Sequence, residues 1–151
     1  MKKLFLMLLA STLFSFTAVS QKLATEKVPD VVKAAFTSKF PDAVKVSWEL
    51  ENANEFEANF QLNNKETSAN FDNAGNCLET EIEIKVADLP MAVQETLKKD
   101  FSGMQVNEAS KIESAKYGSC FEAEVKNGNE KFDILLSADG KILSKSKSDD
   151  D

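Results

Sequence analysis

The chain contains no histidine and no arginine, and all 18 of its basic residues are lysines. Without histidine it cannot form a Ser-His-Asp triad, a Cys-His pair or a His-ligated zinc site, and without arginine it cannot clamp a phosphate with a bidentate guanidinium. With 151 residues it is also too short to be a large multidomain enzyme. These absences exclude the common catalytic machinery, and we expect a protein that is not an enzyme and carries no cofactor.

Residues 1–20 have the pattern of a secretory signal peptide. Lys2 and Lys3 precede an apolar region that ends in the small-x-small sequence Ala18-Val19-Ser20. Polar residues interrupt this region, which is too short to span a bilayer comfortably. We therefore predict cleavage after Ser20 and a periplasmic or secreted protein with no membrane insertion.

The remaining chain is strongly acidic. Residues 1–20 hold two of the lysines and no acid, so 16 lysines face 25 acidic residues beyond them, a net charge of −9. Such a charge repels nucleic acid and anionic lipid, and it favours basic or cationic partners. Residues 148–151 read as a disordered acidic tail.

An internal repeat organises the sequence. When the chain is aligned with itself so that Val28 falls on Leu89, the apolar positions of 28–40 fall on those of 89–101, with Thr96 as the one polar exception. The i, i+3, i+4, i+7 spacing in each segment is typical of an amphipathic helix, and the proline near each start suits a first helical turn. Each copy is therefore predicted to open with a helix.

After each helix the apolar pattern changes to strict alternation, and the alignment moves so that Phe56 falls on Phe121. Val44, Val46, Trp48 and Leu50 alternate with polar residues, as do three further segments of the first copy and their counterparts in the second. Alternation predicts antiparallel strands with one buried face, and Asn/Gly-rich turns such as Asn127-Gly128 predict hairpins.

The predicted fold is α+β: two copies of a helix followed by a four-stranded antiparallel meander, with both helices on one face of the sheet. The first copy spans residues 21–85 and the second spans 86–147. Because one short helix covers only one face of four strands, the other face is expected to be open. The pattern leaves open the oligomeric state and whether the copies share one continuous sheet.

Several motifs carry a family resemblance. They are Val28-Pro29 through Phe40-Pro41, Val46-Ser47-Trp48-Glu49, residues 56–60, Phe71-Asp72 with Gly75, and residues 79–84 followed by Asp88-Leu89-Pro90. In this order they resemble the PepSY-like, beta-lactamase-inhibitor-like family of exported bacterial proteins, commonest in Bacteroidetes. The resemblance implies a tandem fold like that of the beta-lactamase inhibitor protein, located in the periplasm or outside the cell. An inhibitory role is implied only by analogy of fold.

Strand parity places a series of glutamates on the face without helices. The candidate partner-binding residues are Glu55, Glu57, Glu79, Glu81, Glu83, Glu122 and Glu124, with Glu49 on the same face. Clustered carboxylates focus a negative potential that attracts a basic protein, a peptide or hydrated cations, although exposed glutamates also serve solubility and prevent edge pairing. On an open strand they should stay hydrated and ionised, which argues against glycosidase-type acid/base catalysis.

Other candidate sites have simpler structural explanations. Residues 72–76 loosely resemble a calcium loop, but a hairpin turn explains them fully, and we expect no metal site. Cys77 and Cys120 are both placed on the open face with a strand between them, too far apart for a disulfide. Trp48 is predicted to lie in the core.

The sequence thus predicts a non-catalytic exported module that docks a protein or peptide on an open acidic sheet face, with enzyme inhibition as one form of that docking. The alternative is a periplasmic sensor or binder of cations or small envelope components. An enzyme that uses carboxylates alone is the weakest hypothesis.

Overall fold

The computed structural model describes residues 21–147, so the predicted signal peptide (1–20) and acidic tail (148–151) lie outside the described residues. Two α-helices, two 3-10 helices and nine strands make up this part of the chain. In chain order they are β1 (Gln21–Leu23), η1 (Thr25–Lys27), α1 (Asp30–Lys39), β2 (Val44–Asn52), β3 (Glu55–Leu62), β4 (Lys65–Asp72), β5 (Cys77–Ile84), η2 (Val86–Asp88), α2 (Met91–Asp100), β6 (Gln105–Ser114), β7 (Gly118–Asn127), β8 (Glu130–Ser137) and β9 (Ile142–Lys147).

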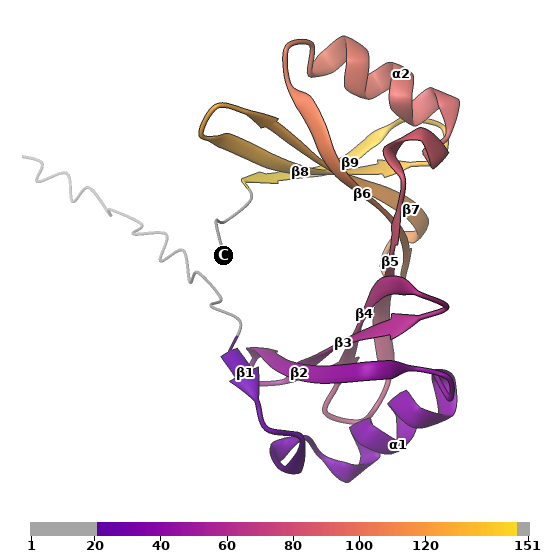
Figure 1. Cartoon of the computed structure of the whole chain (residues 1–151), viewed down its shortest axis with the longest axis vertical. Helices are drawn as coiled ribbons and strands as arrows, with labels where there is room; N and C mark the ends of the chain where they lie inside the picture. Colours follow the sequence, from indigo (N-terminus) through magenta and orange to yellow (C-terminus); the bar gives the residue numbers. More distant parts are fainter. Residues whose placement is uncertain (1–20, 148–151) are drawn as a thin grey trace, which may run out of the picture.

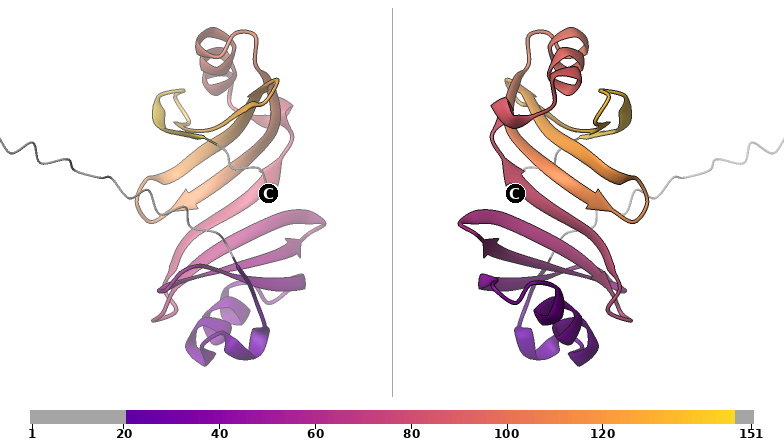
Figure 2. Two further views of the ribbon diagram at one scale, coloured as in Figure 1. Left: turned by 90° about the vertical axis from the view of Figure 1, so that its left-hand side faces the viewer. Right: turned by 90° about the vertical axis from the view of Figure 1, so that its right-hand side faces the viewer.

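All nine strands form one antiparallel sheet, in which the spatial order of the strands follows the sequence. Figure 1 shows that this sheet bends into an open curve, with α1 and α2 on its outer, convex side near the two ends. The two views of Figure 2 show the twist that accumulates from strand to strand between the two helices. The predicted α+β class is confirmed, and β1 is a strand that the sequence pattern did not predict.

Each helix begins directly after a proline and buries one stripe. Asp30 and Met91 are the first helical residues after Pro29 and Pro90, and each helix ends where the amide of a phenylalanine bonds back one turn, from Phe40 to Phe36 and from Phe101 to Leu97. The fixed φ of proline prepares the chain for a helical start. The apolar stripe of each helix then faces the sheet, as the 3.6-residue spacing predicted.

Two separate cores lie between the helices and the sheet. The first is rich in aromatic rings: Phe36 of α1 makes edge-on contacts with Trp48 and Phe60, with ring centroids 5.3 and 5.0 Å apart. The second is mostly aliphatic and contains Val93, Leu97, Val125, Ile134 and Leu136. Burying each large apolar side chain contributes about 1.5–3 kcal/mol, so each helix is held mainly by its own core.

The start of β2 departs from the predicted alternation. Trp48 is buried, as predicted, but Val44 and Val46 are 55% and 38% exposed. The pairing of β2 with β3 shifts register between Val44 and Ser47, and Lys45 within this bulge has a φ of +56°. A bulge inserts an extra residue and changes the face to which its neighbours point, so the prediction that both valines lie in the core was wrong.

Within residues 21–147, neither helix has the length and apolar character that crossing a bilayer requires.

Candidate functional site

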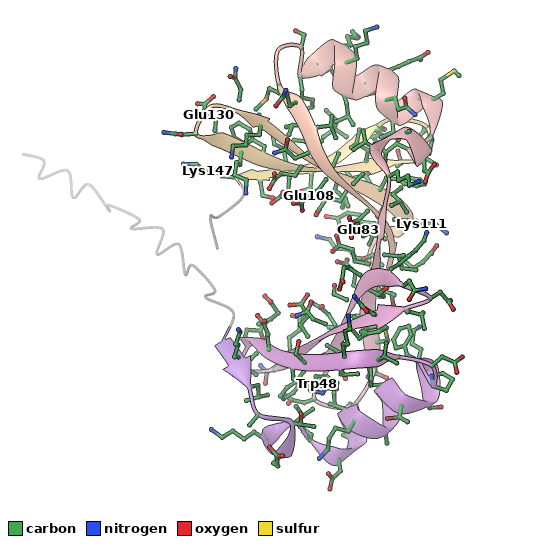
Figure 3. The ribbon with its side chains drawn as sticks, in the orientation of Figure 1. Trp48, Glu83, Glu108, Lys111, Glu130 and Lys147 are labelled. Atoms are coloured by element: carbon green, nitrogen blue, oxygen red, sulfur yellow. The ribbon has the colours of Figure 1, made fainter. Side chains whose placement is uncertain are left out.

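The seven predicted binding glutamates lie on three alternate strands of the sheet. Two are on β3, three on β5 and two on β7, and in each strand they alternate with side chains that face the helices. Figure 3 shows Glu83 and Glu108 on the inner, concave side of the curved sheet, with Lys111 on the opposite side. We call the inner surface over β3 to β8 the concave acidic face.

Cross-strand pairing brings these glutamates together across the face. Glu57 pairs with Asn70, which in turn pairs with Glu79, and Glu83 pairs with Ser110, which pairs with Glu122. Only one small polar residue therefore separates two carboxylates along each row. With strands about 4.8 Å apart, the two carboxylates of such a row lie on strands about 10 Å apart, on one continuous acidic surface.

A groove of about 570 Å³ lies at the centre of the concave acidic face, over β3 to β6. Five carboxylates line it, those of Glu57, Glu66, Glu81, Glu83 and Glu108, together with Asn59, Thr67, Ser68 and Ser110. Sequence reasoning missed two of these carboxylates. The alternation of apolar and polar residues in β4 was enough to predict the orientation of Glu66. Glu108 follows a bulge between Val106 and Glu108, so counting alternate residues along β6 from Val106 gives the wrong face for its side chain.

The pKa of Glu57 is raised from the ordinary 4.5 to about 7. Burial is the main cause, followed by repulsion from Glu51 and a hydrogen bond with the same residue, with a smaller repulsion from Glu49. A hydrogen bond with Ser68 acts in the opposite direction. Because burial and like charges both disfavour the ionised form, Glu57 holds a proton for much of the time near neutral pH.

The pKa of Glu122 is also raised to about 7, mainly by burial and then by the charges of Glu81, Asp133 and Glu79. Burial likewise raises the pKa of Glu81, against a lowering hydrogen bond with Ser110. The expectation that all these glutamates stay hydrated and ionised was wrong. The sheet is curved, so its carboxylates converge and exclude part of the water that a flat sheet would admit.

Two predicted site residues are already engaged by side chains of the same protein. Glu124 forms an ion pair with Lys131, at 2.9 Å between Oε2 and Nζ, and accepts a hydrogen bond from Asn107. Glu55 accepts hydrogen bonds from the amide groups of Asn52 and Asn70. A partner that binds either glutamate therefore competes with these internal contacts.

The two cysteines are free, as predicted, but for a partly different reason. Cys77 packs against the first core on the helix side, because the β4–β5 pairing shifts register between Asn70 and Phe71. Cys120 is fully buried and pairs with Ile112, which pairs with Glu81 of the concave acidic face. The cysteines thus lie on opposite faces, and the prediction that both occupy the open face was wrong for Cys77.

In the turn at residues 72–76, the carboxylate of Asp72 is hydrogen-bonded to other residues of the same turn. Asp72 accepts hydrogen bonds from the backbone amides of Ala74 and Asn76 and from the side-chain amide of Asn76. These bonds lower the pKa of Asp72, chiefly through Asn76. No grouping of three or more potential metal ligands occurs within residues 21–147.

Comparison with known proteins identifies the family. The sequence model of the family described as "Putative beta-lactamase-inhibitor-like, PepSY-like" matches residues 54–144, more than half of the chain. The chain therefore belongs to the PepSY-like, beta-lactamase-inhibitor-like family, and the resemblance seen in the sequence is confirmed. No curated protein matches the chain.

Solved structures share the fold. A DUF2874 family protein from Bacteroides uniformis is 24% identical, with a TM-score of 0.71 over 79% of this chain and 88% of its own. A protein described as BLIP-like from Bacteroides fragilis is 25% identical, with a TM-score of 0.68 over 82% and 90%. A Bacteroides eggerthii protein described as "putative periplasmic" is 20% identical, with a TM-score of 0.71 over 80% and 88%.

Proposed function

We propose that this protein is an exported, non-catalytic binding module that docks a basic protein or peptide on the concave acidic face. The observation that carries the proposal is the groove in which five carboxylates converge over β3 to β6. Its curvature suits a convex segment of a partner, and its charge suits lysine or arginine side chains. The binding residues are Glu55, Glu57, Glu79, Glu81, Glu83, Glu122 and Glu124, and the three whose pKa values burial raises, Glu57, Glu81 and Glu122, contribute most.

The raised pKa values of Glu57 and Glu122 support a cationic partner. Each reflects burial first, and then repulsion from neighbouring carboxylates. A cation bound among these carboxylates favours their ionised form and offsets the repulsion between them. Binding of a cationic partner therefore removes a repulsion that is present in the unbound protein. A binding role explains this arrangement of carboxylates without invoking a chemical reaction.

Export to the periplasm or the cell exterior is supported by the lysine-initiated apolar segment 1–20 and by the description of the Bacteroides eggerthii relative. Enzyme inhibition is one form that docking could take. The description of the family and that of the Bacteroides fragilis structure favour it.

We also propose that residues 21–85 and 86–147 are two copies of one unit. The pairing registers support this. Leu23 pairs with Trp48 between β1 and β2, and Ile84 pairs with Ala109 between β5 and β6. The same shift along the sequence takes Leu23 to Ile84 and Trp48 to Ala109. The pair Phe71 and Cys77 corresponds in the same way to Leu136 and Ile142. In this scheme β5 corresponds both to β1, the first strand of a unit, and to β9, the last.

The docking proposal is tested with a ten-residue lysine peptide, measured by calorimetry at pH 8, above the pKa of about 7 of Glu57 and Glu122. The variant Glu57→Gln/Glu81→Gln/Glu122→Gln should weaken binding at least tenfold, because each lost charge contributes roughly 0.5–1 kcal/mol. The control Glu26→Gln/Glu95→Gln/Asp100→Asn removes the same charge from exposed residues of η1 and α2. Equal weakening by both variants would show that only net charge matters and that the groove is not the docking site.

Titration of the same proteins with calcium distinguishes the alternative function, cation binding, from docking of a basic protein or peptide. Five carboxylates line one groove and attract hydrated cations by their charge, although no three of them within residues 21–147 are grouped to ligate a single ion. Saturable calcium heat that disappears in Glu57→Gln/Glu81→Gln/Glu122→Gln, together with no binding of the lysine peptide, would assign the face to cations.

A further inference from the structure

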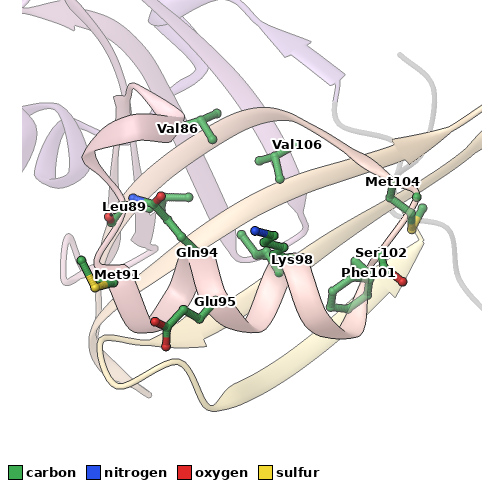
Figure 4. Close-up of a pocket in the computed structure, with 12 residues that line it drawn as sticks. Val86, Leu89, Met91, Gln94, Glu95, Lys98, Phe101, Ser102, Met104 and Val106 are labelled. Carbon is green, nitrogen blue, oxygen red and sulfur yellow. Dashed lines mark hydrogen bonds between the residues drawn. The ribbon is translucent and has the colours of Figure 1, made fainter.

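A second pocket lies on the other side of the molecule, beside α2. It has a volume of about 460 Å³ and opens between η2, α2 and the start of β6 (Figure 4). Its apolar walls are Val86, Leu89, Met91, Leu97, Phe101, Met104 and Val106, and its polar lining residues are Gln94, Glu95, Lys98 and Ser102. The size and the mostly apolar lining with few polar groups are those of a small-molecule site.

The first half of the chain does not offer the same surface. In the alignment that places Val28 on Leu89, four apolar residues of the pocket replace polar or small ones. Val86, Met91, Met104 and Val106 stand where the first half has Thr25, Asp30, Ala43 and Lys45. Apolar side chains at the entrance cost solvation free energy unless something covers them, so this difference distinguishes a binding pocket from an ordinary surface of the fold.

The core beside the pocket, which shares Leu89 and Leu97 with the pocket walls, is filled differently in the two halves. In the first half, the Trp48 ring lies against Phe36, with centroids 5.3 Å apart, in a core that includes Val28. The counterparts of Phe36 and Val28 are Leu97 and Leu89, which form walls of the pocket. The counterpart of Trp48 is Ala109, which is buried in the same core as both leucines.

The second half therefore has walls of the same kind but lacks the ring. Phe60, another ring of the first core, corresponds to Val125, whereas Ala69 corresponds to Ile134 and Thr67 to Phe132, so the second core gains side-chain volume at other positions but not at that of Trp48. Close-packed interiors leave few voids, and apolar cavities left by missing side chains bind apolar molecules of matching shape.

We propose that this pocket binds a small, neutral aromatic molecule, whose ring lies between α2 and β6 as the Trp48 ring lies between α1 and β2. The proposal rests on the correspondence of the two units but not on docking at the concave acidic face. The polar rim carries one exposed cation, Lys98, and one exposed anion, Glu95, which together favour no net charge on the ligand.

The test is a calorimetric titration of the whole protein with indole as the probe. We expect saturable one-site binding to the wild type and at least tenfold weaker binding to Ala109→Trp, which supplies the missing ring from the protein itself. Because a tryptophan at this buried position could disturb folding, Val106→Phe provides a second way of filling the pocket from its wall. Lys45→Phe, at the counterpart of Val106, is the matched control and should bind indole as the wild type does.

Circular dichroism verifies that each variant is folded before its titration is interpreted. No saturable indole binding by the wild type would overturn the proposal, and so would undiminished binding by folded Ala109→Trp and Val106→Phe. Benzylammonium and indole-3-acetate should bind at least fivefold more weakly than indole. If either binds as well as indole, the assignment to neutral ligands is wrong. None of these results depends on whether the lysine peptide binds the groove.

Discussion

The hydroxyl of Thr96 in α2 donates a hydrogen bond of 2.8 Å to the carbonyl oxygen of Gly140, in the turn between β8 and β9. This bond joins two segments far apart in the sequence and holds the hairpin turn against the helix. Gly140 has a φ of +83°, and a Cβ on it would lie 2.5 Å from the carbonyl oxygen of Ala92. A Cβ added to Gly75 would likewise lie 3.0 Å from the carbonyl oxygen of Val31 in α1.

Replacing Gly140 by alanine is therefore expected to destabilise the protein by about 3 kcal/mol, of which roughly 1 kcal/mol comes from the positive φ and the remainder from moving the turn away from α2. The free energy of unfolding in urea measures the effect. Gly128→Ala is the matched control, since Gly128 has a φ of +60° but an added Cβ meets nothing within 4 Å. If both substitutions cost the same, the contact between turn and helix contributes nothing.

Stability should fall as the pH rises from 5 to 8. In the folded protein the pKa values of Glu57 and Glu122 are about 7, above the ordinary 4.5, so the folded state binds more protons than the unfolded state in this range. This contribution is complete below pH 4.5 and is lost as the pH rises through 7. After allowance for the partial exposure of both side chains, we expect a loss of about 2 kcal/mol between pH 5 and 8.

Urea unfolding at four pH values from 5 to 8 measures this dependence. The variant Glu57→Gln/Glu122→Gln should flatten the profile and be more stable than the wild type at pH 8. Glu26→Gln/Glu95→Gln, on the helical side, should leave the slope unchanged. A wild-type profile that rises with pH would contradict the assignment of raised pKa values.

Loss of Lys131 should cost more than loss of its ion-pair partner. The side chains of Lys131 and Glu124 are only 22% and 12% exposed, and their charged atoms are 2.9 Å apart. Lys131→Met leaves a mostly buried carboxylate on an already acidic face, at a cost of about 2 kcal/mol at pH 8, whereas Glu124→Gln keeps the hydrogen-bonding shape. Thermal unfolding of both variants tests the order, and a larger loss for Glu124→Gln would reverse our interpretation.

The two cores should respond differently to equivalent truncations. Phe36 has ring contacts with Phe40, Trp48, Phe60 and Phe71. Phe36→Ala should lower the free energy of unfolding by about 4 kcal/mol, and Leu97→Ala, at the corresponding position of α2, should lower it by about 3 kcal/mol. Chemical denaturation compares the two variants. A smaller loss for Phe36→Ala would mean that the aromatic cluster collapses readily around the missing ring.

Both cysteines should be found as free thiols in protein purified without reductant. β6 lies between β5 and β7, and the bulge in β5 turns Cys77 toward the helices while Cys120 stays on the other side. Alkylation in denaturant without reductant should add two labels per chain by mass spectrometry. A protein that takes no label until it is reduced would contradict the strand order and the bulge.

The local sequence was sufficient for the main elements. Helical spacing in segments 28–40 and 89–101 depends only on which side chains must leave water, so it predicted α1 and α2. Alternation predicted the central parts of the strands and the burial of Trp48 for the same reason. The missing histidine and arginine likewise excluded whole classes of chemistry from composition alone.

Bulges mark the positions where alternation failed. Val44, Val46, Cys77 and Glu108 all lie at or beside register shifts, and each faces a side that strict parity does not give. A bulge depends on how two strands pair, and the sequence of one strand alone does not specify that pairing. β1 was missed because its short length, Gln21–Leu23, is too little to show a period.

The sequence by itself determined the polarity of this protein: which residues avoid water, which carry charge, and that nearly all the chemistry on its sheet is acidic. Only the tertiary structure decided how close those charges lie. Bending nine strands into one curved sheet leaves Glu57, Glu81 and Glu122 on a common, partly dehydrated surface, where burial, and then repulsion from the carboxylates nearest to each, raises their pKa values. Electrostatic energy depends on distance and on access of water, and both are properties of the folded arrangement rather than of the order of residues.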